Sequence, residues 1–274
     1  MARSRRRHRS HRRRGGMGTP VLAAIAAVLV AGVAGAFWWS GQDQKLNAVD
    51  DVTLCPVQHG PAGMTAILVD LTDPISPAQH ALLTALLDKE IADAPRSTQF
   101  TMGVVTEDPA DWGASAPLCK PQDRDTAGAL TQNATLIGQR YRERFLAPLQ
   151  ADISRLTSVS GANQSPIMES LQALVADTPG FVTFDGPRRI VIVSDLLQHS
   201  DVMSFYRGGD WDSFRASPAF QRLGSTLSAA DVTILQVPRP GEGVRDPRIL
   251  EDFWARYFDA QGAHLPVLKR LGDL

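Results

Sequence analysis

The chain has 274 residues, with 28 lysines and arginines against 29 aspartates and glutamates, so its formal net charge is −1 at pH 7. The charges are unevenly placed, because residues 1–40 hold eight arginines and no acid, which leaves 20 − 29 = −9 for residues 41–274. An acidic remainder disfavours partners such as nucleic acid and anionic lipid. The roughly 225 residues beyond the first segments suit one domain with a substantial core.

The amino-terminal end predicts a membrane anchor. Residues 1–18 form a basic tail, and residues 19–39 form a transmembrane helix whose stretch Val21 to Trp39 carries no charge. Such a length spans a bilayer, and arginines before it predict a cytoplasmic amino terminus. We therefore expect a single-pass inner-membrane protein whose remaining part is periplasmic or extracellular. Two alternatives are a signal cleaved near Ala34-Gly35-Ala36 and a nucleic-acid-binding arginine tail.

A linker is expected at residues 40–54, followed by an extracytoplasmic domain at residues 55–274. The chain has two cysteines, Cys55 and Cys119, both outside the apolar segment. In an oxidising compartment such a pair predicts a disulfide, which on the chain-entropy model stabilises the fold by about 3–4 kcal/mol. The alternative is two free thiols. A metal site is not indicated, because no CxxC motif or nearby histidine pattern is present.

A strand buried on both faces is predicted at residues 65–69, which are small, aliphatic or β-branched. An uninterrupted apolar run of this length is typical of a parallel sheet. The run ends in the polar residues Asp70, Thr72 and Asp73. Ligands of open α/β sheets bind just beyond the carboxyl ends of the strands. These three side chains are therefore the first candidates for a functional site.

The next helix should begin with Ser76 as its N-cap, Pro77 at its first position and Gln79 completing a capping box, and should run to about Asp93. The other expected elements, in chain order, are a strand at 99–106, an irregular stretch at 107–126, a helix at 130–156 with a break near Pro148, a helix that begins at Ser165-Pro166, a buried strand at 189–195, a helix at Ser217-Pro218, a buried strand at 231–237, and a helix from Asp246-Pro247 to Gly262.

This alternation of strands and helices predicts an α/β fold, a three-layer sandwich with a mostly parallel central sheet. One transmembrane helix precedes it.

Three features in order resemble a von Willebrand factor A (vWA) domain, which implies a sheet of vWA or Rossmann type, and the resemblance covers residues 64 to about 262. They are a buried strand that ends in Asp70-Leu71-Thr72-Asp73-Pro74, a Gly161-to-Ser165 turn before a helix, and a buried strand that ends in Ser194-Asp195. In that family a D-x-S-x-S motif, a threonine and a later aspartate form a metal-ion-dependent adhesion site.

The resemblance assigns the metal-ligand positions to Asp70, Thr72, Ser165 and Asp195, and it implies a divalent cation such as Mg²⁺ or Mn²⁺. Pro74 stands where the family has its second serine, so one hydroxyl ligand is missing from the octahedral oxygen set that Mg²⁺ requires. A degenerate site is therefore the expectation, with no cofactor assigned.

Simpler roles exist for the same residues. Ser165 could be a helix N-cap, and Asp70 and Asp195 could be strand ends bonded to loop amides. His199 follows Asp195 closely, but a single histidine in a loop is expected to be solvated.

The function expected from these features is binding of another protein, as a scaffold or assembly module of a bacterial-type envelope complex, without enzymatic activity. The alternative is a metal-dependent periplasmic hydrolase that uses Asp70 and Asp195. The chain has no G-x-S-x-G, P-loop or G-x-G-x-x-G motif.

Overall fold

A computed structural model describes residues 18–46, 48–70, 75–107, 113–128, 132–157, 163–224, 227–238 and 247–271. The chain divides into two compact units, Met1–Ala48 and Val49–Leu274. Each unit is considered by itself.

The first unit contains helix α1, Gly18–Leu46. Its stretch Val21–Trp39 is exposed along its whole length and is long and apolar enough to cross a membrane. A signal sequence has the same properties. The helix continues beyond Trp39 to Leu46, so the first half of the expected linker is helical.

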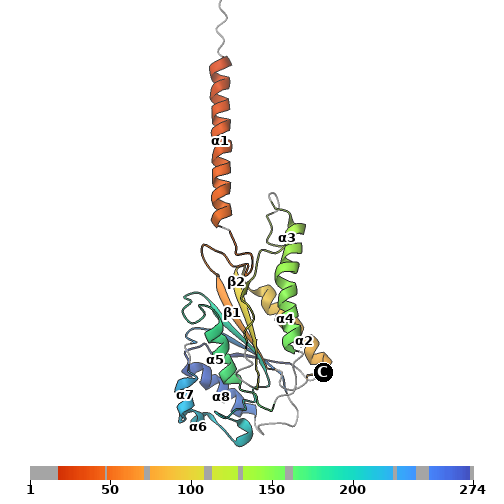
Figure 1. Cartoon of the computed structure of the whole chain (residues 1–274), viewed down its shortest axis with the longest axis vertical. Helices are drawn as coiled ribbons and strands as arrows, with labels where there is room; N and C mark the ends of the chain where they lie inside the picture. The colour runs from red at the N-terminus through yellow and green to blue at the C-terminus, as the bar shows by residue number, and fades with distance from the viewer. Residues whose placement is uncertain are drawn as a thin grey trace, which may run out of the picture. The chain divides into compact units, whose positions relative to one another are not determined.

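The second unit is built on a six-stranded sheet in the order β3-β2-β1-β4-β5-β6. Figure 1 shows the central strands β1 and β2 of this sheet together with the helices around it. Every pair of neighbours is parallel except β2 and β3, which are antiparallel. The predicted three-layer sandwich with a mostly parallel sheet is therefore confirmed. The strands are β1 Gly63–Val69, β2 Thr98–Val104, β3 Leu118–Cys119, β4 Arg188–Ser194, β5 Asp231–Gln236 and β6 Val267–Arg270.

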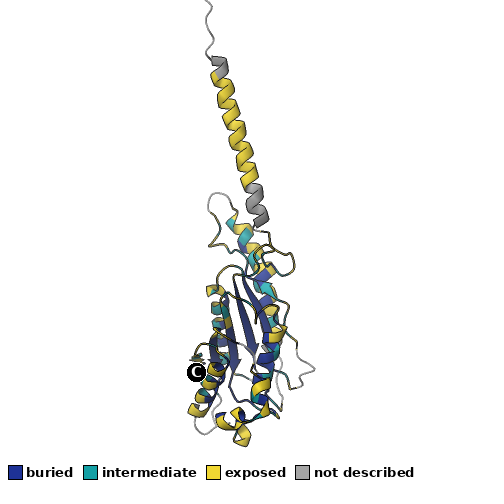
Figure 2. Ribbon diagram, turned by 90° about the vertical axis from the view of Figure 1, so that its left-hand side faces the viewer, coloured by how far each residue is buried: buried dark blue, intermediate teal, exposed yellow. Residues whose placement is uncertain are grey.

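Helices cover both faces of the sheet because alternate residues of each strand point to opposite sides. On β1, Ala66 and Leu68 belong to the core shared with α5 and α8, whereas Ile67 and Val69 belong to the core shared with α2 and α4. Figure 2 shows the buried strands between the helical layers. The helices are α2 Pro77–Asp93, α3 Ala134–Tyr141, α4 Ala147–Thr157, α5 Ile167–Asp177, α6 Trp211–Arg215, α7 Pro218–Arg222 and α8 Pro247–Ala260, with a short 3₁₀ helix η3 Phe205–Arg207.

Local sequence signals set several helix ends as expected. Ser76 Oγ accepts from the Gln79 N–H at 3.1 Å, and Gln79 Oε1 accepts from the Ser76 N–H at 2.9 Å, which confirms the capping box of α2. Beyond the end of α8, Gly262 adopts the left-handed conformation with φ 77° that terminates a helix.

The expected break near Pro148 takes another form. Arg142–Leu146 forms a π-helical segment, η2, and the Ala147 N–H donates to the carbonyl of Arg142. A proline one residue later has no N–H to continue the α-helical pattern, and a π-bulge is a common way to absorb such an interruption. The helix therefore changes its hydrogen-bond register instead of ending.

The disulfide between Cys55 and Cys119 is present, as predicted. Cys119 lies on β3, a two-residue strand inside the stretch expected to be irregular. The Cys119 N–H also donates to the Thr53 carbonyl at 2.7 Å. The bridge therefore fastens the segment that enters β1 to the antiparallel edge of the sheet.

Candidate functional site

The carboxyl ends of β1 and β4 meet at the point where the strand order reverses. Val69 pairs with Val193, and the Asp70 N–H continues the ladder by donating to the Val193 carbonyl at 2.7 Å. Asp70 therefore lies beside Ser194 at the end of β4. In doubly wound sheets this reversal point is where ligands bind.

Two hydroxyl groups converge on Asp70. Ser165 Oγ donates to Asp70 Oδ2 at 3.0 Å, and Ser194 Oγ donates to the same oxygen at 2.7 Å. Asp70 is only 2% exposed and Ser194 is fully buried. A carboxylate withdrawn from water needs such donors, and a hydrogen bond to a charged group contributes about 1.5–3 kcal/mol. The two serines thus offset part of the free-energy cost of burying this aspartate.

Ser165 is not the N-cap of α5. Pro166 occupies the cap position and no side chain caps the helix. Instead, the Ser165 backbone pairs with His199 in an isolated β-bridge, with N–H to carbonyl distances of 2.8 and 2.9 Å. Its hydroxyl is therefore available to Asp70, and the simple capping role is wrong.

The loop after β4 turns sharply at the site. Asp195 Oδ1 accepts from the Leu197 N–H at 2.8 Å, so this carboxylate organises its own loop. Leu196 has φ 70°, a left-handed conformation that is uncommon for a non-glycine residue. It is held there because its N–H donates to Ser194 Oγ and its carbonyl accepts from Trp254 Nε1 of α8 at 3.0 Å.

A second group of polar side chains fixes the same loop to α5. Gln198 is fully buried, and its amide donates to Glu169 Oε2 at 2.9 Å and accepts from the Met168 N–H at 2.9 Å. Ser200 Oγ donates to the other oxygen of Glu169 at 2.6 Å. These bonds attach the loop to the start of α5, next to Ser165.

His199 is half-buried, so the expectation of a solvated histidine is wrong. Its Nδ1 lies 2.8 Å from Ser204 Oγ, and its ring lies 5.3 Å from the ring of Tyr206. Tyr206 is 50% exposed. The loop therefore presents an aromatic side chain to solvent close to the buried Asp70 and Ser165.

Three of the four predicted site residues lie at this edge: Asp70 and Ser165 are hydrogen-bonded, and Asp195 follows Ser194 at the end of β4. Thr72 and Pro74 lie outside the described residues. Sequence reasoning missed Ser194 as a member of the site. The available signal was its position directly across from Asp70 once β1 and β4 are taken as neighbours.

The donor set can be tested against the divalent cation that the resemblance implies. Mg²⁺ requires about six oxygens in octahedral geometry. The described residues supply two carboxylates and two hydroxyls, and both hydroxyls donate to one oxygen of Asp70. Within the described ranges no cluster of three or more His, Cys, Asp or Glu side chains could hold a metal ion. The described donors alone do not make up a cation site.

No protein-family model and no curated protein matches this sequence. Among solved structures the chain is similar to the VWA domain of SpRpn10, with 13% identity over 78% of this chain and 90% of that chain and a TM-score of 0.35.

It is also similar to an aerotolerance-related membrane protein from Bacteroides fragilis NCTC 9343, with 14% identity over 77% of this chain and 92% of that chain and a TM-score of 0.34. A third similar structure is proximal thread matrix protein 1 from the mussel byssus, with 12% identity over 76% of this chain and 42% of that chain and a TM-score of 0.38. Similarities at this level assign no function. The meeting of Asp70 with Ser165 at the ends of β1 and β4 agrees with the resemblance noted in the sequence, and we use the term vWA-like only as a name for the α/β fold of the second unit.

Replacing Asp70 with alanine should lower the free energy of unfolding by about 1–3 kcal/mol, because it leaves the buried hydroxyls of Ser165 and Ser194 without their acceptor. Urea unfolding of the full chain in detergent, followed by tryptophan fluorescence, measures the loss. Asp201→Ala is the matched control, since Asp201 is an exposed acid on the same loop, and its effect should stay within about 0.5 kcal/mol. Equal effects of the two variants would contradict the structural role of Asp70.

Proposed function

We propose that this protein is a membrane-anchored vWA-like module that binds another protein outside the cytoplasm, as a component of a bacterial-type envelope assembly. The proposal rests on the position of the Asp70 cluster, which consists of Asp70, Ser165 and Ser194, at the point where the strand order of the sheet reverses. Ligands of this fold class bind at that point, and here it is bordered by the loop after β4 and by the short helix η3, whose Tyr206 and Arg207 are exposed.

The exposed side chains of this loop suit a protein partner. Tyr206 and Arg207 face solvent at the edge that holds Asp70 and Ser165. Tyrosine and arginine are enriched in protein interfaces and carry a large part of the binding energy there. The hydrogen bonds of Glu169 to Gln198 and Ser200 hold the loop in shape before binding, which lowers the entropy lost on association.

The anchor and the compartment are part of the same proposal. An apolar α1 preceded by arginines supports insertion in the inner membrane with a cytoplasmic amino terminus. The disulfide supports an oxidising compartment for the domain.

The proposed binding mode needs no metal ion. Asp70 receives its donors from Ser165 and Ser194 inside the protein, and Pro74 removes one of the hydroxyls that the related adhesion sites use. The set Asp70, Thr72, Ser165 and Asp195 is thus proposed as a degenerate adhesion site. A hydrolase based on Asp70 and Asp195 is not favoured, since both carboxylates hold parts of the fold together.

A photoreactive amino acid placed at Tyr206 in the membrane-bound protein should give a discrete crosslinked product with its partner in cells. The same substitution at Val57 is the matched control, because Val57 is 65% exposed and belongs to the segment that enters β1. The Tyr206 product should weaken in a double variant that also carries Ser165→Ala, because residue 165 then no longer donates a hydrogen bond to Asp70. Products of equal strength at Tyr206 and Val57, or none at Tyr206, would contradict the proposed binding edge.

An alkaline phosphatase fused after Leu274 should be active, whereas a β-galactosidase fused at the same place should be inactive, because the arginines of residues 1–18 keep the amino terminus in the cytoplasm. The opposite pattern of activities would reverse the proposed topology. Immunoblots of the same fusions report cleavage: a full-length band in the membrane fraction supports the anchor, and a soluble form beginning at Phe37 would show a cleaved signal.

A further inference from the structure

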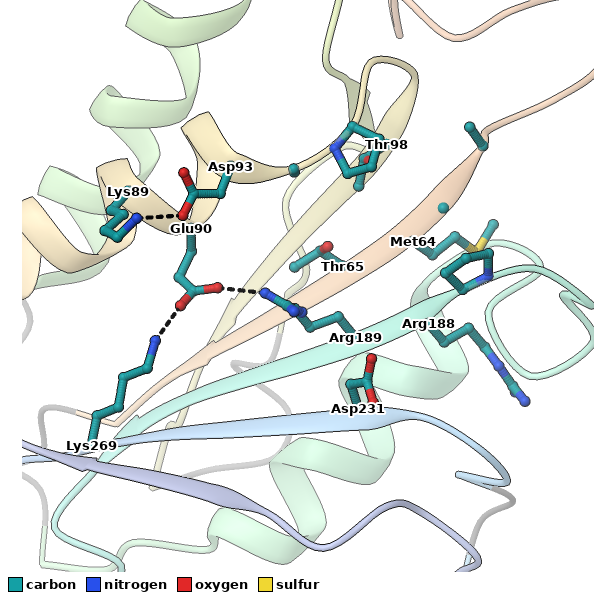
Figure 3. A pocket seen from close by; sticks show the side chains of 15 residues that line it. Met64, Thr65, Lys89, Glu90, Asp93, Thr98, Arg188, Arg189, Asp231 and Lys269 are labelled. Carbon is teal, nitrogen blue, oxygen red and sulfur yellow. Dashed lines mark hydrogen bonds and ion pairs between the residues drawn. The ribbon is translucent and has the colours of Figure 1, made fainter.

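A cavity of about 410 Å³ lies in the vWA-like domain at the amino ends of the strands, the edge opposite Asp70. Its lining includes the first residues of β1, β2, β4 and β5 and the last turn of α2. Figure 3 shows these side chains around the open space. Volumes of this size are usual for sites that bind small molecules.

Two cations share one carboxylate in this cavity. Glu90 Oε2 lies 2.7 Å from Arg189 Nη1, and Glu90 Oε1 lies 2.6 Å from Lys269 Nζ (Figure 3). The Glu90 side chain is only 10% exposed, whereas those of Arg189 and Lys269 are 45% and 42% exposed. The trio therefore carries one net positive charge, and each cation has further N–H donors beyond the one it gives to Glu90.

The other charges that line the cavity balance one another in number, although His264, the partner of Asp231, lies outside the lining. Lys89 lies 2.6 Å from Asp93, and Asp231 lies 2.7 Å from His264. The Asp93 carboxylate raises the pKa of Lys89, chiefly through their hydrogen bond. Arg188 donates to three main-chain carbonyls and is directed away from Glu90. The lining thus holds four cations and three carboxylates, and because Arg188 and Asp231 offset each other, the net positive charge is at Arg189 and Lys269.

We propose that the cavity binds a small phosphate-bearing molecule, with its phosphate on Arg189 and Lys269. The guanidinium fork and the ammonium group are the side chains that recognise phosphate oxygens most strongly. Glu90 keeps the two cations side by side when the ligand is absent. The cavity is larger than one phosphate, so it has room for the rest of the ligand.

The source of the phosphate is a soluble molecule. The part of the chain beyond residue 40 has a net charge of −9, and such a surface is repelled by an anionic bilayer. The cations of the cavity are a local exception to that acidic surface. This inference goes beyond the proposed protein binding, because the two sites lie at opposite edges of the sheet and either can fail alone.

Isothermal titration calorimetry of the full chain in neutral detergent with inorganic phosphate, at constant ionic strength, tests the proposal. We expect saturable binding, and we expect Arg189→Met and Lys269→Met each to weaken it by about tenfold or more, as loss of a charge-assisted hydrogen bond requires. Lys89→Met is the matched control, because Lys89 lines the same cavity but is paired with Asp93; it should change the affinity by less than about twofold.

No saturable binding to the folded wild-type chain, or equal weakening by all three substitutions, would overturn the proposal. If Arg189→Met fails to fold, the phosphate affinity of Lys269→Met decides the test, because Glu90 keeps Arg189 as a cationic partner in that variant. The chain in phosphatidylcholine nanodiscs, with and without phosphatidic acid, distinguishes the sources. Equal phosphate affinity in both supports a soluble ligand, and loss of phosphate binding with phosphatidic acid would overturn that source in favour of a lipid headgroup.

Discussion

The two hydrogen bonds that Ser165 and Ser194 donate to one oxygen of Asp70 join three segments far apart in the chain. These are the end of β1, the turn before α5 and the end of β4. The sheet brings Asp70 and Ser194 together by register alone, but Ser165 reaches them only because its backbone pairs with His199. An aspartate that is 2% exposed is tolerated only with such partners. The loops at this edge therefore take their positions from a buried charge.

Hydrogen bonds connect this cluster both to the core and to the loop at the surface. Ser194 accepts from the Leu196 N–H, and Trp254 of α8 donates to the Leu196 carbonyl, so the left-handed turn is fixed from both sides. The aromatic side chains of α8, which are Phe253, Trp254, Tyr257 and Phe258, are buried in the core on one face of the sheet. A rigid core thus supports the loop that carries Tyr206. The cavity around Glu90 involves none of these contacts, so the two proposed binding sites are separate.

Much of this fold could be predicted from local sequence. The apolar runs before Asp70 and Asp195 identified two central strands, Ser76 identified a helix start, and the two cysteines identified the disulfide. The edge strands β3 and β6 were missed because they have two and four residues and no continuous apolar run. The sequence allows two roles for Ser165, a helix N-cap or a site residue, because a serine before a proline fits both. The partnership of Ser194 with Asp70 requires the register of β1 and β4, which no local pattern contains.

The central claim is that Asp70 is satisfied by protein hydroxyls and needs no cation. Titration of Mg²⁺ or Mn²⁺ against thermal unfolding of the full chain, with Asp70→Ala in parallel, tests it most directly. Ligand binding to the folded state raises the melting temperature with ligand concentration. We predict a flat response for the wild-type chain and no effect of a chelator. A concentration-dependent rise in melting temperature that Asp70→Ala abolishes would contradict the account and show a functional metal site.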